Sequence, residues 1–252
     1  MGKTPRAGVV VLAAGRGRRF GAPTPKQFLT LGGRPVFMHS LAFFDTLEWV
    51  TQIVLVTPGD GLPEGCVGDL DALRRRPVCV AGGPRRQDSV AAGLAALATH
   101  ASPFDVALVH DAARPFPDLC AVKRLAQAAT HAGGGLLAAR ATDTVKRAAV
   151  ADDDAPCVAE TLDRATIWLA QTPQALRADL VARAVAEMRR PDLDVTDEAS
   201  LLERWGVPVT LIESSARNLK ITQPADLPVA EALLECKTFR MRNSECGITV
   251  VP

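Results

Sequence analysis

The chain has 252 residues, of which 48% are hydrophobic, so it is long enough to bury a core of its own. Charged residues make up 23% and the formal net charge is only +1, which argues against a protein that binds nucleic acid or a membrane surface through its overall charge. Six scattered cysteines lack Cys-x-x-Cys spacing, and no segment is long and apolar enough to span a bilayer. We therefore expect reduced, mostly buried thiols and a cytoplasmic location.

Short β-branched runs alternate with Ala- and Leu-rich stretches along the first half of the chain. Strands are predicted over residues 8–13, 52–57, 77–81, 106–110 and 135–139, and helices over about 35–46, 87–99 and 118–132. The strands are apolar on both faces, as in Val9 to Leu12, which is typical of a parallel sheet covered by helices on each side. The predicted fold class is α/β, with a doubly wound, mostly parallel sheet flanked by helices.

Near residue 141 the alternation of strands and helices stops. Residues 143–146 and 157–160 flank the polar turn Asp152-Asp153-Asp154, which predicts a β-hairpin that projects from the main sheet. A hairpin without a sheet partner is only marginally stable, so we expect an arm over about residues 141–166 that packs on a second subunit. Such an arm would make the protein a homodimer.

The C-terminal part of the chain holds two further helix signals. Thr196 is the expected N-cap of one helix, because Asp197 and Glu198 suit its positive first turn. The last helix is predicted over residues 225–234. No linker divides the chain, so we expect a single domain over residues 1–236 and a disordered or peripheral tail over 237–252.

The loop from Leu12 to Lys26 carries the strongest chemical signal. Small residues let its backbone approach a ligand, and its amide groups suit phosphate oxygens; these residues are Ala13, Ala14, Gly15 and Gly17. No acidic residue precedes Asp45, so Arg19 and Lys26 lie in a strongly cationic segment. Since open α/β sheets bind ligands beyond the carboxyl ends of their strands, this loop is predicted to bind the phosphates of a nucleoside triphosphate.

Two other nucleotide-binding motifs fit this loop poorly. Phe20 stands at the third glycine position of the Rossmann dinucleotide fingerprint, and no acidic residue follows at the distance needed to hold a ribose. The Gly-Lys-Ser/Thr of a Walker A loop is absent. The alternative is an ordinary strand-to-helix loop with solvated arginines, which the downstream Pro25-Lys26-Gln27 disfavours.

Two later clusters also follow predicted strands. In residues 82–89, glycines allow close approach to a base or ribose, and Gly83, Arg86 and Ser89 are the candidate contacts. After the strand ending at His110, Asp111 suits a metal or a substrate hydroxyl, and Arg114 suits a phosphate. A capped turn and a salt-bridged helix start are the plain structural interpretations. His110 itself is expected to be a core residue without a catalytic role.

Arg164 and Lys220 are later cations that could grip a second phosphate, as a transferase joining two phosphates requires. In this order, the clusters closely resemble those of 2-C-methyl-D-erythritol 4-phosphate cytidylyltransferases over roughly residues 8–235. The most specific motifs are Leu12 to Phe20 with Pro25-Lys26-Gln27, His110 to Pro115, Thr196 to Ser200 and Asn218 to Thr222. The resemblance implies a Rossmann-like nucleotidyltransferase fold with a protruding β-hairpin dimerisation arm.

In such enzymes a methylerythritol phosphate oxygen attacks the α-phosphorus of CTP, and pyrophosphate leaves with Mg²⁺ assistance. The resemblance implies that Arg19 and Lys26 stabilise the transition state, with Arg164 and Lys220 as further catalytic cations. It assigns the nucleotide to Ala13, Ala14, Gly15, Gly17, Gly83, Arg86 and Ser89. It assigns the sugar phosphate to Asp111, Arg114, Thr144, Arg164 and Lys220.

The resemblance also implies that the hairpin crosses to a partner subunit, where Thr144 and Arg164 would serve the neighbour's site. Asp111 is the candidate Mg²⁺ ligand. Pro84 stands where we expect an acidic residue near the cytosine. The alternatives are a ribitol-5-phosphate cytidylyltransferase, which Thr196 to Ser200 and the Ala112-Ala113 pair disfavour, and a non-catalytic nucleotide-binding module.

Overall fold

The computed structural model describes residues 4–15, 24–100, 102–149 and 156–245, and for residues 237–245 it describes the backbone alone. Its main feature is a seven-stranded sheet in the order β11-β7-β10-β6-β1-β4-β5. The strands are β1 (Ala7–Leu12), β4 (Val50–Thr57), β5 (Val78–Ala81), β6 (Val106–Asp111), β7 (Gly134–Arg140), β10 (Trp168–Arg177) and β11 (Val209–Glu213). In this sheet only β10 runs antiparallel to its neighbours, β6 and β7, so the predicted mostly parallel sheet is confirmed.

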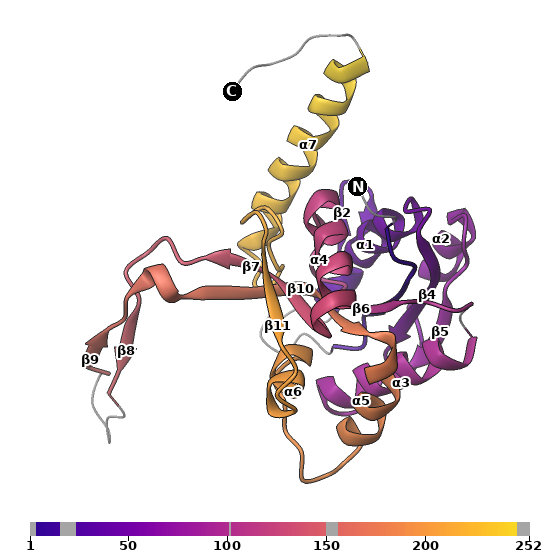
Figure 1. Ribbon diagram of the computed structural model, residues 1–252. Helices are drawn as coiled ribbons and strands as arrows, with labels where there is room; N and C mark the ends of the chain where they lie inside the picture. Colours follow the sequence, from indigo (N-terminus) through magenta and orange to yellow (C-terminus); the bar gives the residue numbers. More distant parts are fainter. Residues whose placement is uncertain (1–3, 16–23, 101, 150–155, 246–252) are drawn as a thin grey trace.

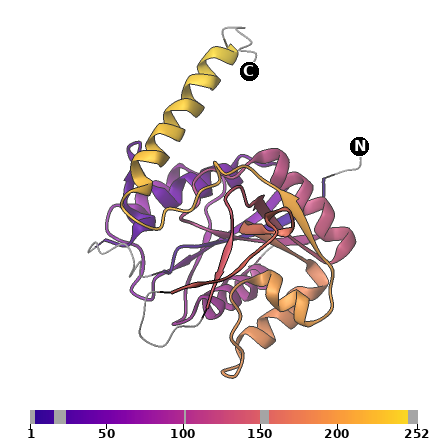
Figure 2. The same cartoon turned by 90° about the vertical axis from the view of Figure 1, so that its left-hand side faces the viewer.

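Helices cover both faces of the sheet (Figures 1 and 2). They are α1 (Val36–Asp45), α2 (Cys66–Asp69), α3 (Arg86–His100), α4 (Leu119–Ala132), α5 (Val181–Met188), α6 (Glu198–Arg204) and α7 (Asp226–Glu245). Because alternate residues of a strand point to opposite faces, Val9 packs in a core with α1 and α4, whereas Val10 packs in a second core with α3 and α5. The predicted sandwich of three layers is therefore present.

Short elements connect these layers. They are β2 (Thr30–Leu31), β3 (Arg34–Pro35) and the 3-10 helices η2 (Lys26–Phe28), η3 (Leu70–Ala72), η4 (Arg164–Thr166) and η5 (Ala178–Leu180). A small third core joins Leu31 and Val36 to Ile221 and to Ala230 of α7. This core fixes the start of α7 beside α1, close to the segment that contains Lys220.

The predicted hairpin arm is formed by β8 (Lys146–Ala148) and β9 (Val158–Thr161), which pair antiparallel. The ends of β7 and β10 lead into it, with Trp168 opposite Arg140. Figure 1 shows the arm extending far from the body of the molecule. The predicted Asp152-Asp153-Asp154 turn lies outside the described residues.

Two predictions about the C-terminal part were wrong. Asp197, not Thr196, is the N-cap of α6: its carboxylate accepts a hydrogen bond from Ser200 N at 2.9 Å, and Ser200 Oγ accepts one from Asp197 N at 3.4 Å. A capping box of this kind places the cap one residue later than expected. The last helix, predicted over residues 225–234, spans Asp226–Glu245.

The longer α7 has a simple cause. Residues 237–245 contain neither glycine nor proline, so nothing in the sequence stops the helix after its packed first half. Beyond the body, α7 projects away from the sheet (Figures 1 and 2), which is why no apolar periodicity marks this stretch. Along the described residues, no helix combines the length and the apolar character needed to cross a membrane.

Candidate active site

A large pocket lies where four adjacent parallel strands end. It has a volume of about 1130 Å³, and its walls come from the segments that follow β1, β4, β5 and β6. Eight predicted site residues line it, namely Ala14, Gly15, Lys26, Gly83, Arg86, Ser89, Asp111 and Lys220. This is the place where open α/β sheets bind ligands, and it brings together residues from four distant parts of the chain.

The first wall is the loop after β1, which Gln27 holds in place. The buried Gln27 Nε2 donates hydrogen bonds to the carbonyl oxygens of Ala13 and Gly15, each at 2.7 Å. Ala13 is buried and donates its own N–H to Val56 O at 2.8 Å, so it supports the loop from behind. Lys26 lies beside this clamp and faces the pocket. Of the other predicted residues of this loop, Gly17 and Arg19 lie outside the described residues.

Gln27 is a functional residue that the sequence interpretation misses. Within the motif Pro25-Lys26-Gln27, the sequence points to a role for Lys26 alone. The available signal is that Gln27 follows a site lysine, in a segment that forms a 3-10 helix. Nothing in the sequence shows that its side-chain amide reaches back across the loop.

The second wall is the turn between β5 and α3, where only glycine fits. A Cβ on Gly82 would lie 2.4 Å from the Cβ of Ala14, and one on Gly83 would lie 2.4 Å from the Cβ of Asp88. Gly83 N donates to Ser89 Oγ at 3.1 Å, so Ser89 stabilises this turn as well as lining the pocket. The two loops therefore pack closely, and the wall at the two glycines carries no side chain that would keep a ligand away from the backbone.

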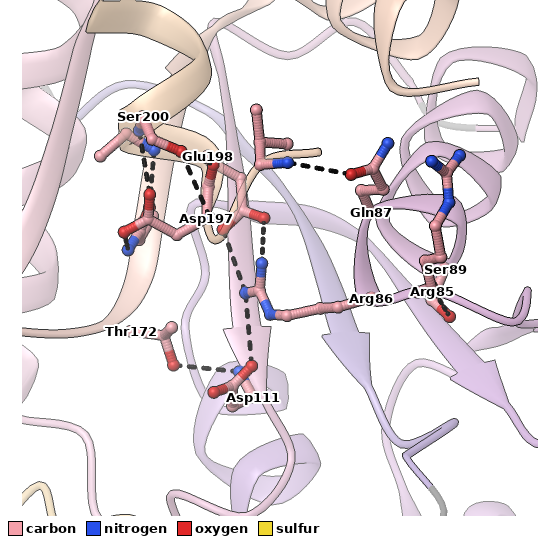
Figure 3. A network of polar contacts seen from close by, with 12 residues as sticks. Arg85, Arg86, Gln87, Ser89, Asp111, Thr172, Asp197, Glu198 and Ser200 are labelled. Carbon is pink, nitrogen blue, oxygen red and sulfur yellow. Dashed lines mark hydrogen bonds and ion pairs between the residues drawn. The ribbon is translucent and has the colours of Figure 1, made fainter. Parts of the chain in front are cut away.

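A network of charges forms the third wall (Figure 3). Arg86 Nη1 contacts Glu198 Oε1 at 2.7 Å, its Nη2 lies 3.4 Å from Asp111 Oδ1, and Lys220 Nζ lies 2.6 Å from Asp111 Oδ2. Burial raises the pKa of Asp111, but the charges of Arg86 and Lys220 outweigh that effect and hold the pKa well below its usual range. Asp111 is therefore ionised at neutral pH.

The Asp111–Arg114 turn is held from behind by His110 and Thr172. Thr172 Oγ1 accepts from Asp111 N at 3.0 Å and lies 3.2 Å from His110 Nδ1, while His110 Nε2 lies 3.0 Å from Arg114 O. The threonine hydroxyl thus donates to Nδ1, and Nε2–H donates to the carbonyl, in a neutral ring. Burial lowers the pKa of His110 to about 4, which agrees with its expected core role.

Arg114 does not line the pocket, although the sequence placed it at the substrate. Its Nη1 donates to Asn218 O at 2.7 Å, and its Nη2 lies 3.4 Å from Ala170 O on β10. Nε of Arg114 and Oδ1 of Asn218 are buried without a hydrogen-bond partner in the described structure. Arg114 therefore ties the Asp111 turn to β10 and to the segment before Lys220.

Thr144 and Arg164 lie on the exposed arm and not in the pocket of their own chain. Arg164 Nη1 donates to Thr142 O at 2.7 Å, and the side chain is exposed. The arm extends away from the body (Figure 1), so these two residues are available only to something that packs against the arm.

Asp60 and Asp111 are the carboxylates among the described residues that line the pocket, and no group of three or more His, Cys, Asp or Glu side chains is arranged as a metal site there or elsewhere in the described part. Mg²⁺ is commonly held by one or two carboxylates together with substrate phosphates. The ionised Asp111 fits that kind of site.

Comparisons with known proteins agree with one another. The family model for 2-C-methyl-D-erythritol 4-phosphate cytidylyltransferase matches residues 7–236. A protein of that name from Chromobacterium violaceum is 47% identical over 230 residues, which are 90% of this chain and 97% of that protein. One from Geobacillus thermodenitrificans is 39% identical over 226 residues, 89% of this chain and 95% of that protein. The crystal structure of the Thermus thermophilus cytidylyltransferase gives a TM-score of 0.69 at 32% identity, covering 90% of this chain and 98% of that one.

Proposed function

The chain belongs to the 2-C-methyl-D-erythritol 4-phosphate cytidylyltransferase family, and we propose that its reaction takes place in the pocket beyond β1, β4, β5 and β6. The enzyme transfers a cytidylyl group from CTP to 2-C-methyl-D-erythritol 4-phosphate, giving 4-diphosphocytidyl-2-C-methyl-D-erythritol and pyrophosphate in non-mevalonate isoprenoid biosynthesis. The observation that supports the location is the gathering of Lys26, Arg86 and Lys220 around one pocket.

The triphosphate lies on the first loop in this proposal. The backbone of Ala14 and Gly15, clamped from behind by Gln27, approaches the phosphates, while Lys26 supplies a fixed positive charge. Arg19, outside the described residues, adds a second charge from the same loop. When an oxygen of the sugar phosphate attacks the α-phosphorus, negative charge grows on the phosphoryl oxygens, and cations that are already in place stabilise it without reorganising.

The cytidine lies against the turn of Gly83 and Ser89, with Arg86 at its side. Support comes from the lack of side chains on this wall: Gly82 and Gly83 are both too close to a neighbour to carry one. Pro84, which has no backbone N–H, lines the same wall. The base contacts in this chain therefore come from the neighbouring residues and not from an acidic side chain at that position.

The sugar phosphate lies on the other side of the pocket, near Lys220 and Asp111, with Arg114 behind them. We propose that Thr144 and Arg164 of a partner subunit complete this half of the site in a homodimer. The exposed arm supports this, since Val158 of β9 is 63% exposed and every other residue of β8 and β9 is exposed as well.

Mg²⁺ is the proposed cofactor, and Asp111 is the residue that would hold it, together with the triphosphate. When bound, the ion would neutralise phosphate charge and favour departure of pyrophosphate. Lys220 and Arg86 keep Asp111 in the ionised form that such binding requires.

We also propose a cytoplasmic location. The cysteines in the described part of the chain, Cys66, Cys79, Cys120, Cys157 and Cys236, are free thiols. All of these except Cys66 are exposed, so the expectation of mostly buried thiols is wrong. Exposed thiols of this kind persist in a reducing compartment.

The test is pyrophosphate release by the Lys26→Ala variant. Loss of a cation that meets the transition-state charge should reduce turnover by at least about 100-fold, while circular dichroism and gel filtration match the wild type. Lys123→Ala, which removes an exposed lysine of α4, is the matched control and should keep full activity. Unchanged turnover in Lys26→Ala would contradict the proposed site, and faster turnover of ribitol 5-phosphate by the wild type would contradict the substrate.

A further inference from the structure

Glu198 is a buried carboxylate that does not line the pocket but contacts a residue that does. It is the first residue of α6, and its side chain is 1% exposed. Arg86, which lies 112 residues earlier at the start of α3, reaches it from the pocket wall. Figure 3 shows Arg86 extending from α3 toward Glu198 and Asp111. The sequence alone suggests only that Glu198 suits the first turn of a helix.

Arg86 and Glu198 form a bidentate salt bridge. Arg86 Nη1 donates to Glu198 Oε1 at 2.7 Å, and Arg86 Nη2 donates to Glu198 Oε2 at 3.3 Å. Two parallel hydrogen bonds between planar groups fix the orientation of the guanidinium as well as its position. Arg86 Nη2 also lies 3.4 Å from Asp111 Oδ1, on the pocket side. The guanidinium is therefore held from behind by Glu198 and faces the pocket through its other edge.

Glu198 is itself held firmly, because the segment before it is pinned to α3. Gln87 Nε2 donates to Met188 O at 3.0 Å and to Leu193 O at 2.8 Å, and Gln87 Oε1 accepts from Val195 N at 3.0 Å. Arg85 Nη1 adds a hydrogen bond to Leu193 O at 2.9 Å. Residues on either side of Arg86 thus fix the segment that leads to its partner.

A second set of contacts fixes the start of α6 from the sheet. Gln174 of β10 donates through Nε2 to Asp197 Oδ2 at 2.9 Å and accepts through Oε1 from Ala199 N at 2.8 Å. The two residues that flank Glu198 are therefore bonded to one glutamine side chain. This leaves the Glu198 carboxylate in one place, which a residue that positions another side chain requires.

The positions of the charged groups indicate that Glu198 prevents a closer pairing of Arg86 with Asp111. Asp111 already has Lys220 at 2.6 Å, and Arg86 approaches Asp111 less closely than it approaches Glu198, at 3.4 Å against 2.7 Å. Without the charge of Glu198, the nearest carboxylate to Arg86 would be Asp111, because a cation in a partly buried site requires a partner. Arg86 would then turn from the wall toward Asp111 and compete there with Lys220.

We propose that Glu198 is a positioning residue for nucleotide binding, which holds Arg86 on the pocket wall, available to CTP, and limits its pairing with Asp111 to the longer contact. This inference rests on the proposed function, since it takes Arg86 to be a CTP contact. Its predicted consequence is a weaker affinity for CTP, with a smaller change in the rate of the chemical step, when the Glu198 charge is removed.

The experiment measures CTP binding by calorimetry, and KM and kcat separately, for Glu198→Gln and Glu198→Asp. Glu198→Gln, which keeps the size but loses the charge, should weaken CTP binding about 10-fold, which corresponds to the loss of one well-placed charged contact. Its kcat should change less than about 3-fold, and Glu198→Asp, which keeps the charge, should show a smaller loss of affinity. Ser200→Ala is the matched control: it weakens the same helix start without touching Arg86, so it should lower the melting temperature and leave CTP affinity unchanged.

A double-mutant cycle decides whether Glu198 acts through Arg86. In an Arg86→Ala background, adding Glu198→Gln should change CTP affinity less than about 2-fold, since the side chain that it positions is gone. The double variant also removes both charges of the pair, so it should fold even if Glu198→Gln does not. Three results would each overturn the proposal. CTP affinity could be unchanged in Glu198→Gln, or Ser200→Ala could lose as much CTP affinity as Glu198→Gln does. Glu198→Gln could also weaken CTP binding by the same factor in the Arg86→Ala background as in the wild type. These binding measurements do not depend on turnover, whereas failure of the wild type to release pyrophosphate would overturn the proposed function instead.

Discussion

The body of this molecule is built from buried strands, whereas its arm is built from exposed strands. In the body, β1 and β6 are buried along their whole length except at the last residue, where each strand reaches the pocket. In the arm, every residue of β8 and β9 is exposed. The body holds its site residues in place with its own core, whereas the arm has paired strands and little else.

This difference separates two kinds of site residue. Asp111 and Lys220 form an ion pair within one chain and Lys26 lines the same pocket, so their place in the site follows from the geometry of that chain. Thr144 and Arg164 are exposed on an arm that projects from the body (Figure 1). Whatever orders the arm must therefore also decide where these two residues act, and a second subunit would do both.

Among the variants that test this difference between body and arm, Arg164→Ala is expected to lose the most turnover. If Arg164 grips the sugar phosphate of the neighbouring site, its loss should reduce turnover about 1000-fold, which is about 4 kcal/mol of transition-state stabilisation. Unfolding of the body should not change, because the hydrogen bond of this side chain stays within the arm, to Thr142 O. Steady-state pyrophosphate release and thermal denaturation measure the two quantities.

Mixing variants shows which chain Arg164 serves. In a symmetric dimer with shared sites, a chain with Lys26→Ala and a chain with Arg164→Ala form one site that lacks both changes. An equal mixture that exchanges subunits should therefore recover about a quarter of the wild-type turnover. No recovery, with subunit exchange verified by co-purification of tagged chains, would mean that Arg164 acts in the site of its own chain.

A second prediction concerns the body alone, where His110 is buried and neutral. Its pKa falls from an ordinary value of 6.5 to about 4, so the unfolded chain binds the proton more readily than the folded chain. The corresponding stability is complete above about pH 6.5 and is lost as the pH falls toward 4, in total about 3 kcal/mol. His110→Gln keeps a donor for Arg114 O and cannot take up this proton.

The measurement is urea denaturation of both proteins between pH 7 and pH 4. The carboxylates that titrate in this range are common to both, so the wild-type free energy of unfolding minus that of His110→Gln isolates the histidine. This difference should fall by about 3 kcal/mol over the range. A difference that stays flat would show that His110 is not held neutral by burial.

The elements that the sequence predicted well are those whose pattern is local. Residues 8–13 and 106–110 are apolar on both faces, and a buried parallel strand is the only simple way to use such a run. No strand was predicted for β10, because Gln171, Thr172 and Gln174 interrupt its apolar pattern although all three are buried. Their amide and hydroxyl groups are satisfied by partners far away in the sequence, which no local pattern reveals.

The same limit applies to the site. The pocket was predicted from residues that follow strands, since the topology alone brings these together. The residues behind them were not: Gln27 clamps the carbonyls of Ala13 and Gly15, and Glu198 holds Arg86. Both are polar side chains that point inward, although the sequence around each is equally typical of an exposed polar residue. Their roles depend on distances that only the folded chain defines.

The smallest expected effect is a change in the free energy of unfolding, and it comes from making the same Val→Ser substitution in the arm and in the body. This pair of variants compares the two regions directly. Val158→Ser changes a residue of β9 that is 63% exposed, so the free energy of unfolding of the isolated chain should change by less than about 0.5 kcal/mol. Val109→Ser is the matched change in β6, where the side chain is fully buried, and it should cost about 3 kcal/mol, since it leaves a cavity and buries a hydroxyl. Self-association, measured by sedimentation equilibrium, should respond in the opposite order, with Val158→Ser weakening it more. If Val158→Ser destabilises the isolated chain as much as Val109→Ser does, then the arm has a core of its own, and its exposed strands do not need a partner to become ordered.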